Sequence, residues 1–171
     1  DASKAESSIL NRVRLAAKDS AATAPAAHGN SHWAYSGSTG PEKWGDLSTD
    51  YHACKAGQMQ SPINLAGGFA AKPQPIQFDY RLTPLRIVNN GHTIQVNYEP
   101  GSSITISGKR YDLLQFHFHS PSEHTVDDKQ TAMELHFVHK AADGALAVVG
   151  VMMNTGDTNR GLGEIWPHIP N

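Results

Sequence analysis

Alternating apolar and polar residues dominate the second half of the chain and predict β-strands. Turn-forming pairs such as Asn-Gly, Pro-Gly, Ser-Gly and Asp-Gly separate the alternating segments, and these pairs favour the tight turns that join antiparallel strands. The pattern therefore predicts an antiparallel meander with strands at residues 85–88, 93–98, 104–106, 111–119, 132–139 and 146–153.

The other segments carry weaker patterns. Residues 1–31 are rich in Ala and Ser and are interpreted as an N-terminal extension or linker, with a weak apolar stripe that predicts a short helix over 9–17. Residues 33–62 contain several Gly and Pro without a sustained period, which indicates irregular backbone. Helical spacing returns at 158–166 and predicts one short helix there.

The composition is typical of one globular domain. At 171 residues and 18.5 kDa the chain is long enough for one hydrophobic core. Fourteen Lys and Arg against 16 Asp and Glu form no basic run, which argues against nucleic acid as a partner. No stretch approaches the roughly 18 consecutive apolar residues of a membrane-spanning helix. Cys54 is the single cysteine and permits no internal disulfide, while 10 histidines stand out.

Histidines occur on two of the predicted strands. His117 and His119 are two residues apart, so both imidazoles project from one face of a strand, with roughly 6–7 Å between their Cα atoms. Glu134, His136 and Val138 share one face of a later strand in the same way. A short Ser-Pro-Ser break makes the two strands candidate neighbours. The sequence therefore predicts that three imidazoles converge.

Three neutral imidazoles without a thiolate suit tetrahedral Zn²⁺ and leave one coordination position for water. Two other interpretations stay open. A His-x-His pair is also typical of the polar side of a half-exposed strand. In addition, His117, His119 and Glu123 have the spacing of the first cupin motif, and His136 would complete a ligand set for iron or manganese, although the second cupin motif is missing.

Seven blocks of the sequence resemble α-class carbonic anhydrases of bacterial type, in the order in which that family carries them. The resemblance implies a mainly β (α+β) fold, with a large twisted, mostly antiparallel central sheet and short peripheral helices. It covers residues 32–171 as a catalytic domain that lacks its C-terminal part. The blocks are His32-Trp-Ala-Tyr35, Gly40-Pro-Glu-Lys-Trp44, Gln60-Ser-Pro-Ile-Asn64, Asn89-Asn-Gly-His92, Gln115-Phe-His-Phe-His119, Ser122-Glu-His-Thr125 and Glu134-Leu-His-Phe-Val-His139.

The resemblance also implies a role for individual residues. His117, His119 and His136 would bind zinc, and Gln115 and Glu134 would accept the free ring N–H groups of the ligands. Further roles are implied for the proton shuttle His92, the gating carboxylate Glu123, the solvent-network residues Tyr35, Asn90 and Gln95, and the substrate-pocket residues Val138 and Val148. His124 and His139 are interpreted as structural.

The activity implied is the reversible hydration of CO2 to bicarbonate and a proton, by attack of a zinc-bound hydroxide and proton transfer through His92. An imidazole can accept and release a proton at neutral pH, as this step requires. The alternatives are a cupin-type metal dioxygenase and a catalytically silent binding module that resembles carbonic anhydrase.

The resemblance ends early. Members of the family continue beyond the position of Asn171 into a Thr-Thr-Pro-Pro segment, whose Thr contacts the residue equivalent to Glu123, so that Glu123 is expected to lack this partner. Bacterial relatives also pair the cysteine equivalent to Cys54 with one after that segment. We therefore expect a C-terminal segment as a partner, a disulfide from Cys54, and a periplasmic or secreted location. A homodimer is left open.

Overall fold

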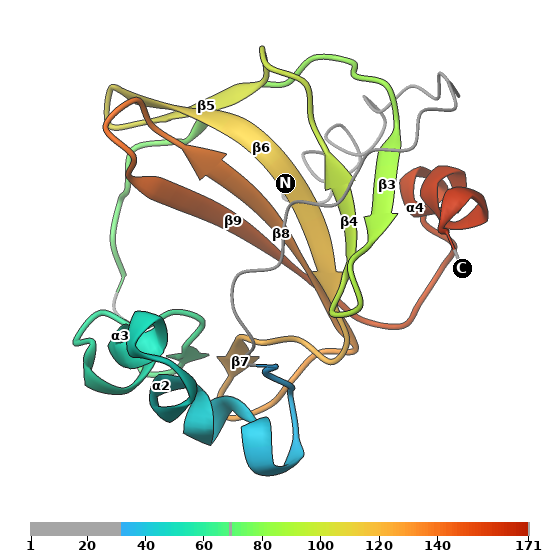
Figure 1. Ribbon diagram of the computed structural model, residues 1–171. Helices are drawn as coiled ribbons and strands as arrows, with labels where there is room; N and C mark the ends of the chain where they lie inside the picture. The colour runs from blue at the N-terminus through green and yellow to red at the C-terminus, as the bar shows by residue number, and fades with distance from the viewer. Residues whose placement is uncertain (1–31, 69, 171) are drawn as a thin grey trace. The chain divides into compact units, whose positions relative to one another are not determined.

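The computed structural model describes residues 32–68 and 70–170 (Figure 1). The predicted helix at 9–17 and the predicted extension at 1–31 lie outside the described residues. The chain divides near residue 63 into two compact units.

Residues 32–63 contain several short helical turns, where the sequence pattern predicts irregular backbone. These turns are η1 (Gly37–Thr39), η2 (Pro41–Lys43), α2 (Trp44–Leu47), η3 (Thr49–Tyr51) and α3 (His52–Ala56). None exceeds five residues, which is too short for a helical period to show in the sequence. The indole Nε1 of Trp44 donates hydrogen bonds to the carbonyl oxygens of Ala34 and Thr39, 3.0 and 3.2 Å away. These bonds hold residues 34–39 against α2.

The larger unit is built on a seven-stranded sheet in which all pairs are antiparallel. The predicted mainly β fold is thereby confirmed. The sheet strands are β2 (Gln77–Asp79), β3 (Arg86–Asn89), β4 (Ile94–Asn97), β5 (Ser103–Ile106), β6 (Lys109–His119), β8 (Met133–Lys140) and β9 (Leu146–Met153). A separate parallel pair joins β1 (Asn64–Leu65) to β7 (Thr125–Val126).

The strand order differs from the predicted meander because β6 is much longer than its neighbours. Along one edge of β6, β5 pairs with its beginning and β4 pairs with residues near its end. Along the other edge lies β8, which in turn pairs with β9 (Figure 1). The predicted neighbourhood of the two histidine strands is confirmed, and β9 is an outer strand of the sheet.

A bulge in β6 decides which side chains face the core. The register with β8 shifts between Leu113 and Gln115. Leu113 is buried before the bulge, while Phe116 and Phe118 are buried after it, so the core face changes from odd to even positions. This shift places His117 and His119 together on the face opposite the two phenylalanines.

The core lies behind the histidine face of the sheet. Phe116 is fully buried, and its ring centroid lies 5.4 Å from that of Phe137 on β8. The helix α4 (Arg160–Ile165) is shorter than predicted because the Asn159 side chain caps it, accepting from the N–H of Leu162; the turn η4 (Trp166–His168) follows it. Ile165 is buried and joins the core cluster.

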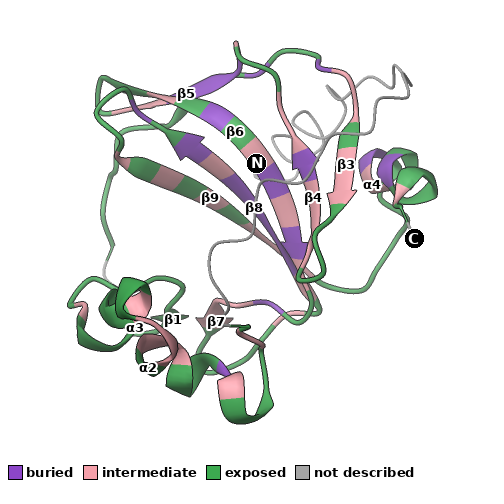
Figure 2. Ribbon diagram, in the orientation of Figure 1, coloured by how far each residue is buried: buried purple, intermediate pink, exposed green. Residues whose placement is uncertain are grey.

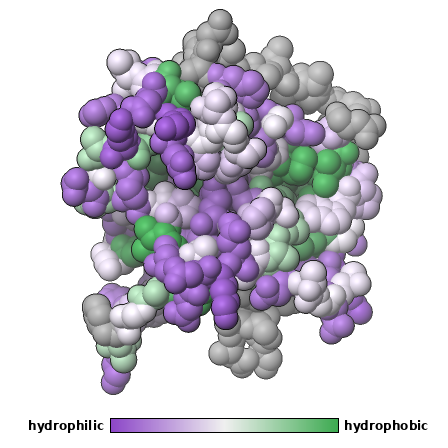
Figure 3. Space-filling model, turned by 90° about the horizontal axis from the view of Figure 1, so that it is seen from below, coloured by the Kyte–Doolittle hydropathy of each residue, from purple (hydrophilic) through white to green (hydrophobic). Residues whose placement is uncertain are grey.

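Exposure is distributed unevenly over the strands. Figure 2 shows buried residues along β6 and β8, whereas β9 is exposed at several positions. In Figure 3, hydrophobic side chains form several separate patches among hydrophilic ones. Within the described part of the chain, no helix has the length and apolar character needed to cross a membrane.

Candidate metal centre

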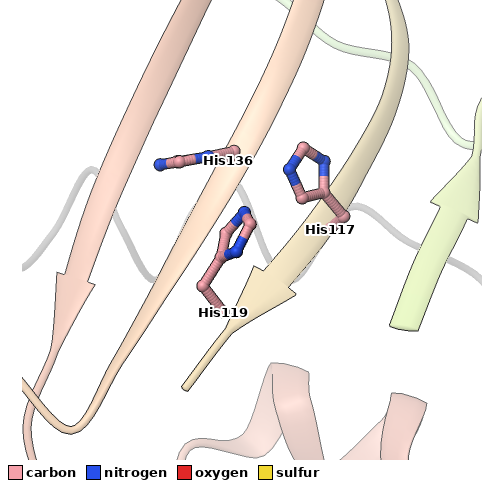
Figure 4. A group of neighbouring side chains, drawn as sticks. All are labelled: His117, His119 and His136. Atoms are coloured by element: carbon pink, nitrogen blue, oxygen red, sulfur yellow. The ribbon is translucent and has the colours of Figure 1, made fainter. Parts of the chain in front are cut away.

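Three imidazoles meet on one face of the sheet. His117 on β6 is paired with His136 on β8, and His119 is paired with Glu134. One nitrogen atom from each of the three rings lies within 4.8 Å of the others. Figure 4 shows the rings gathered together, two from one strand and one from the strand beside it. The structure thus brings together the three residues that the sequence predicts as metal ligands.

The two imidazoles on β6 are held in their neutral form. Burial and, less strongly, charge repulsion from the nearby His119 and His136 lower the pKa of His117 to about 4. Burial and His136 likewise lower the pKa of His119 to about 4. At neutral pH the ring nitrogens therefore keep lone pairs that a cation can use.

Neighbouring acceptor oxygens indicate which nitrogen of His117 and of His136 is available to a metal. Nδ1 of His117 lies 2.8 Å from Oε1 of Gln115. Because a carboxamide oxygen only accepts, Nδ1 carries the proton and Nε2 is left for a metal. Nε2 of His136 lies 2.9 Å from Oε1 of Glu134, and this contact leaves Nδ1 of His136 available for a metal.

Glu134 is a buried, ionised carboxylate at the centre of these contacts. Its Oε2 accepts hydrogen bonds from the backbone N–H groups of Glu123 and His124, both at 2.9 Å. Burial alone would raise the pKa of Glu134, but the hydrogen bonds from His124 and His136 outweigh it and lower the pKa to about 2. The negative charge is therefore present at neutral pH.

Gln115 gives a first testable consequence of this arrangement. Replacing Gln115 by alanine removes the acceptor that orients His117, so we expect the dissociation constant for zinc to rise by roughly 10- to 100-fold. Chelator competition would measure it. Leu114→Ala, at a neighbouring exposed position of β6, is the control and should leave the constant unchanged. Unchanged affinity in Gln115→Ala would contradict this role of the hydrogen bond.

The carboxylate of Glu123 lies beside two of the rings. Its Oε2 is 3.3 Å from Nε2 of His119 and 3.7 Å from Nδ1 of His136, and its side chain is 22% exposed. Glu123 is therefore partly buried, with two imidazoles as neighbours. Glu123 follows the turn after β6, which directs its side chain back toward the histidines.

The residues predicted for proton transfer lie in three different parts of the chain. His92 and Asn90 lie in the exposed turn between β3 and β4, where Oδ1 of Asn90 accepts from the backbone N–H groups of His92 and Thr93. Gln95 pairs with His117 across β4 and β6, so it borders the metal centre. Tyr35 belongs to the other unit, where its ring packs edge-on against Trp33 and Trp44.

The two predicted pocket valines form the next row of the sheet. Val138 on β8 is paired with Val148 on β9, one step along the same face from His136. Val138 is half-buried, whereas Val148 is 52% exposed. His139 points to the opposite face, where its buried Nε2 lies 2.8 Å from the hydroxyl of Tyr80.

His124 belongs to the site, and the sequence analysis missed this. Its Nδ1 lies 2.6 Å from Oε1 of Glu134. His124, Glu134 and His136 therefore form a second group of metal-ligand types. Two atoms bound to one tetrahedral zinc are about 3.3 Å apart. The shorter contact indicates hydrogen bonding within this group rather than shared coordination. The spacing along the chain gives no signal for it.

An antiparallel sheet that gathers three imidazoles on one face has the arrangement of a site that could hold a metal ion. The family model described as eukaryotic-type carbonic anhydrase matches residues 39–171. The chain belongs to this family of carbonic anhydrases, and the recognition from sequence motifs is confirmed.

Several proteins that are similar to this chain are named carbonic anhydrases, and those with solved structures share its fold. The carbonic anhydrase of Pectobacterium carotovorum is 45% identical over 139 residues, which are 81% of this chain and 57% of that protein. A hyperthermostable carbonic anhydrase from a hydrothermal vent chimney is 47% identical with a TM-score of 0.78, and 82% of this chain covers 63% of it. The α-carbonic anhydrase of Thermovibrio ammonificans, solved with the inhibitor sulfanilamide, is 45% identical with a TM-score of 0.78, over 83% and 64% of the two chains. The chain thus spans less than two thirds of these relatives.

Proposed function

We propose that His117, His119 and His136 bind zinc. The observation that supports this is the set of three converging imidazoles, of which Gln115 orients His117 and Glu134 lies against His136. Three neutral ligands suit Zn²⁺ and leave a position for solvent. When bound there, zinc would supply Lewis acidity that lowers the pKa of water toward neutrality.

The proposed reaction is the reversible hydration of CO2 to bicarbonate and a proton. CO2 is linear and apolar, so the adjoining apolar side chains of Val138 and Val148 suit it as a surface beside the imidazoles. His92 lies in an exposed turn and would pass the released proton to solvent. Glu123, beside His119 and His136, would orient the proton of the attacking water by accepting a hydrogen bond.

Metal analysis and a CO2 hydration assay on the purified chain test this function together. We expect one zinc per chain and hydration that a chelator removes. Bound iron without hydration would instead support the cupin-type dioxygenase. Bound zinc without any hydration would support the silent binding module and contradict the proposed activity.

The proton-transfer role of His92 has its own test. In His92→Ala we expect the CO2 hydration rate at low buffer concentration to fall by roughly 10- to 100-fold, because the released proton then has no imidazole carrier. Concentrated imidazole buffer should restore the rate. His168→Ala, an exposed histidine in η4, serves as control. A fall that imidazole does not reverse would contradict the shuttle.

We also propose that a further segment of polypeptide pairs with β9, as the expected C-terminal partner. β9 pairs only with β8 among the described strands, contains no charged residue, and exposes Leu146 and Val148 at 63% and 52%. Natural edge strands of this kind are normally covered or charged. A cavity of about 550 Å³ adjoins β8, β9 and α4, and its apolar lining includes Met133, Leu135, Phe137, Val151, Leu162 and Trp166.

Cys54 belongs to the same proposal. Its thiol is free and exposed, so it is accessible to a cysteine of the proposed segment. Such a disulfide would place the protein in the periplasm or outside the cell. Intact mass under non-reducing conditions, with light scattering, would test it: an added disulfide-linked mass supports the segment, a doubled mass supports the homodimer, and a single 18.5 kDa species with a free thiol refutes both.

A further inference from the structure

A glycine interrupts the apolar strand β9 next to the metal centre. Gly150 lies between Val149 and Val151 and is paired with His136 on β8. A glycine inside a strand costs conformational entropy and packs no side chain. The φ angle of Gly150 is not positive, and the register of β8 and β9 runs without a shift from Met133 to Lys140. Backbone conformation and bulge formation therefore do not explain this glycine.

The space beside Gly150 does explain it. A β-carbon at this position would lie 2.9 Å from Oε1 of Glu134, closer than carbon and oxygen atoms pack. It would also lie 3.7 Å from Cδ2 and 3.9 Å from Nε2 of His136. The place of the missing side chain is thus taken by the carboxylate that orients His136.

The Glu134 oxygen has little freedom to move away. Oε1 is 2.6 Å from Nδ1 of His124 and 2.9 Å from Nε2 of His136. Oε2 is held by two backbone N–H groups, and the whole side chain is 1% exposed. A shift that relieves contact with a methyl group at 150 must lengthen at least one of these bonds.

We propose that Gly150 is a positioning residue of the metal centre: its lack of a side chain lets Glu134 hold the His136 ring in its metal-binding orientation. This inference rests on the proposed zinc function. It extends the site from the three imidazoles and their acceptors to a third strand, β9.

The first test is the zinc affinity of Gly150→Ala, measured by chelator competition. We expect the dissociation constant to rise by about 10- to 100-fold, as when the partner of a metal-bound imidazole is disturbed. Gly156→Ala is the matched control, because among the described residues no atom lies within 4 Å of a β-carbon there. Unchanged affinity in Gly150→Ala would overturn the inference.

A double-mutant cycle separates positioning from general strand packing. In a Glu134→Ala background the added methyl group meets no carboxylate oxygen. Gly150→Ala should then change the zinc dissociation constant by less than about 3-fold, since the two substitutions act on one contact. Equal effects in both backgrounds would show that the methyl group acts only on packing, and the inference would fail.

A third measurement uses the metal-free protein and no second substitution. The ring N–H proton of His124 that Oε1 of Glu134 accepts should exchange slowly with water in NMR spectra. Gly150→Ala should speed its exchange, and Gly156→Ala should not. If the wild-type chain binds no zinc, the proposed function fails, and these exchange rates still decide the role of Gly150: unchanged rates would refute it.

Discussion

Replacing His117 by alanine is expected to weaken zinc binding by more than about 100-fold, beyond the effect of losing a supporting hydrogen bond. The three rings form a triangle, in which the ring centroid of His117 lies 4.8 Å from that of His119 and 5.3 Å from that of His136. The removal of His117 leaves two ligands, too few for a stable zinc site of this type. Zinc content after dialysis against a zinc buffer measures the loss, and CO2 hydration should disappear with it.

The control for this variant is His168→Ala, which removes an exposed imidazole in η4 and should keep full zinc content. The variant also distinguishes the two histidine groups. His124, Glu134 and His136 are all retained in His117→Ala. If this variant keeps its zinc, the metal belongs to that second group, and the proposed ligand set is wrong.

The position of a strand could be predicted where the local pattern of apolar residues is sufficient to define it. β9 has the predicted bounds of residues 146–153, because this largely apolar run is bounded by turn-forming residues and is too short for a typical helix. The pairing of β4 with β6 was not predictable, because it depends on the length of β6 and on the bulge after Leu113. Alternation alone carries no information about which strands become neighbours.

In the candidate site, too, some residues could be predicted from the sequence and others could not. His117, His119 and His136 were predictable because period-two spacing places them on one face of two adjacent strands. Glu134 contacts the backbone N–H groups of Glu123 and His124, and these contacts depend on the path of a turn. They could not be predicted, because the residue types do not show which backbone groups will face a side chain.

Replacing Glu134 by alanine is expected to destabilise the fold by about 3–5 kcal/mol, because several buried donors lose their acceptor and each such loss costs about 1–3 kcal/mol. The substitution leaves two backbone N–H groups and the rings of His124 and His136 without their acceptor. Buried donors that lose both protein and water partners carry the full cost of desolvation. Urea unfolding at neutral pH, read as a change in midpoint at constant slope, measures the loss.

The matched control is Asp112→Ala, which removes a carboxylate from the neighbouring strand β6. Asp112 pairs with Arg110 at 2.8 Å, but both side chains are more than half exposed, so the loss should stay below about 1 kcal/mol. Glu134→Gln keeps the size of the side chain but turns an NH2 group toward donors, so it should also destabilise the protein. Equal midpoints for Glu134→Ala and Asp112→Ala would show that the buried carboxylate and its contacts do not stabilise the sheet.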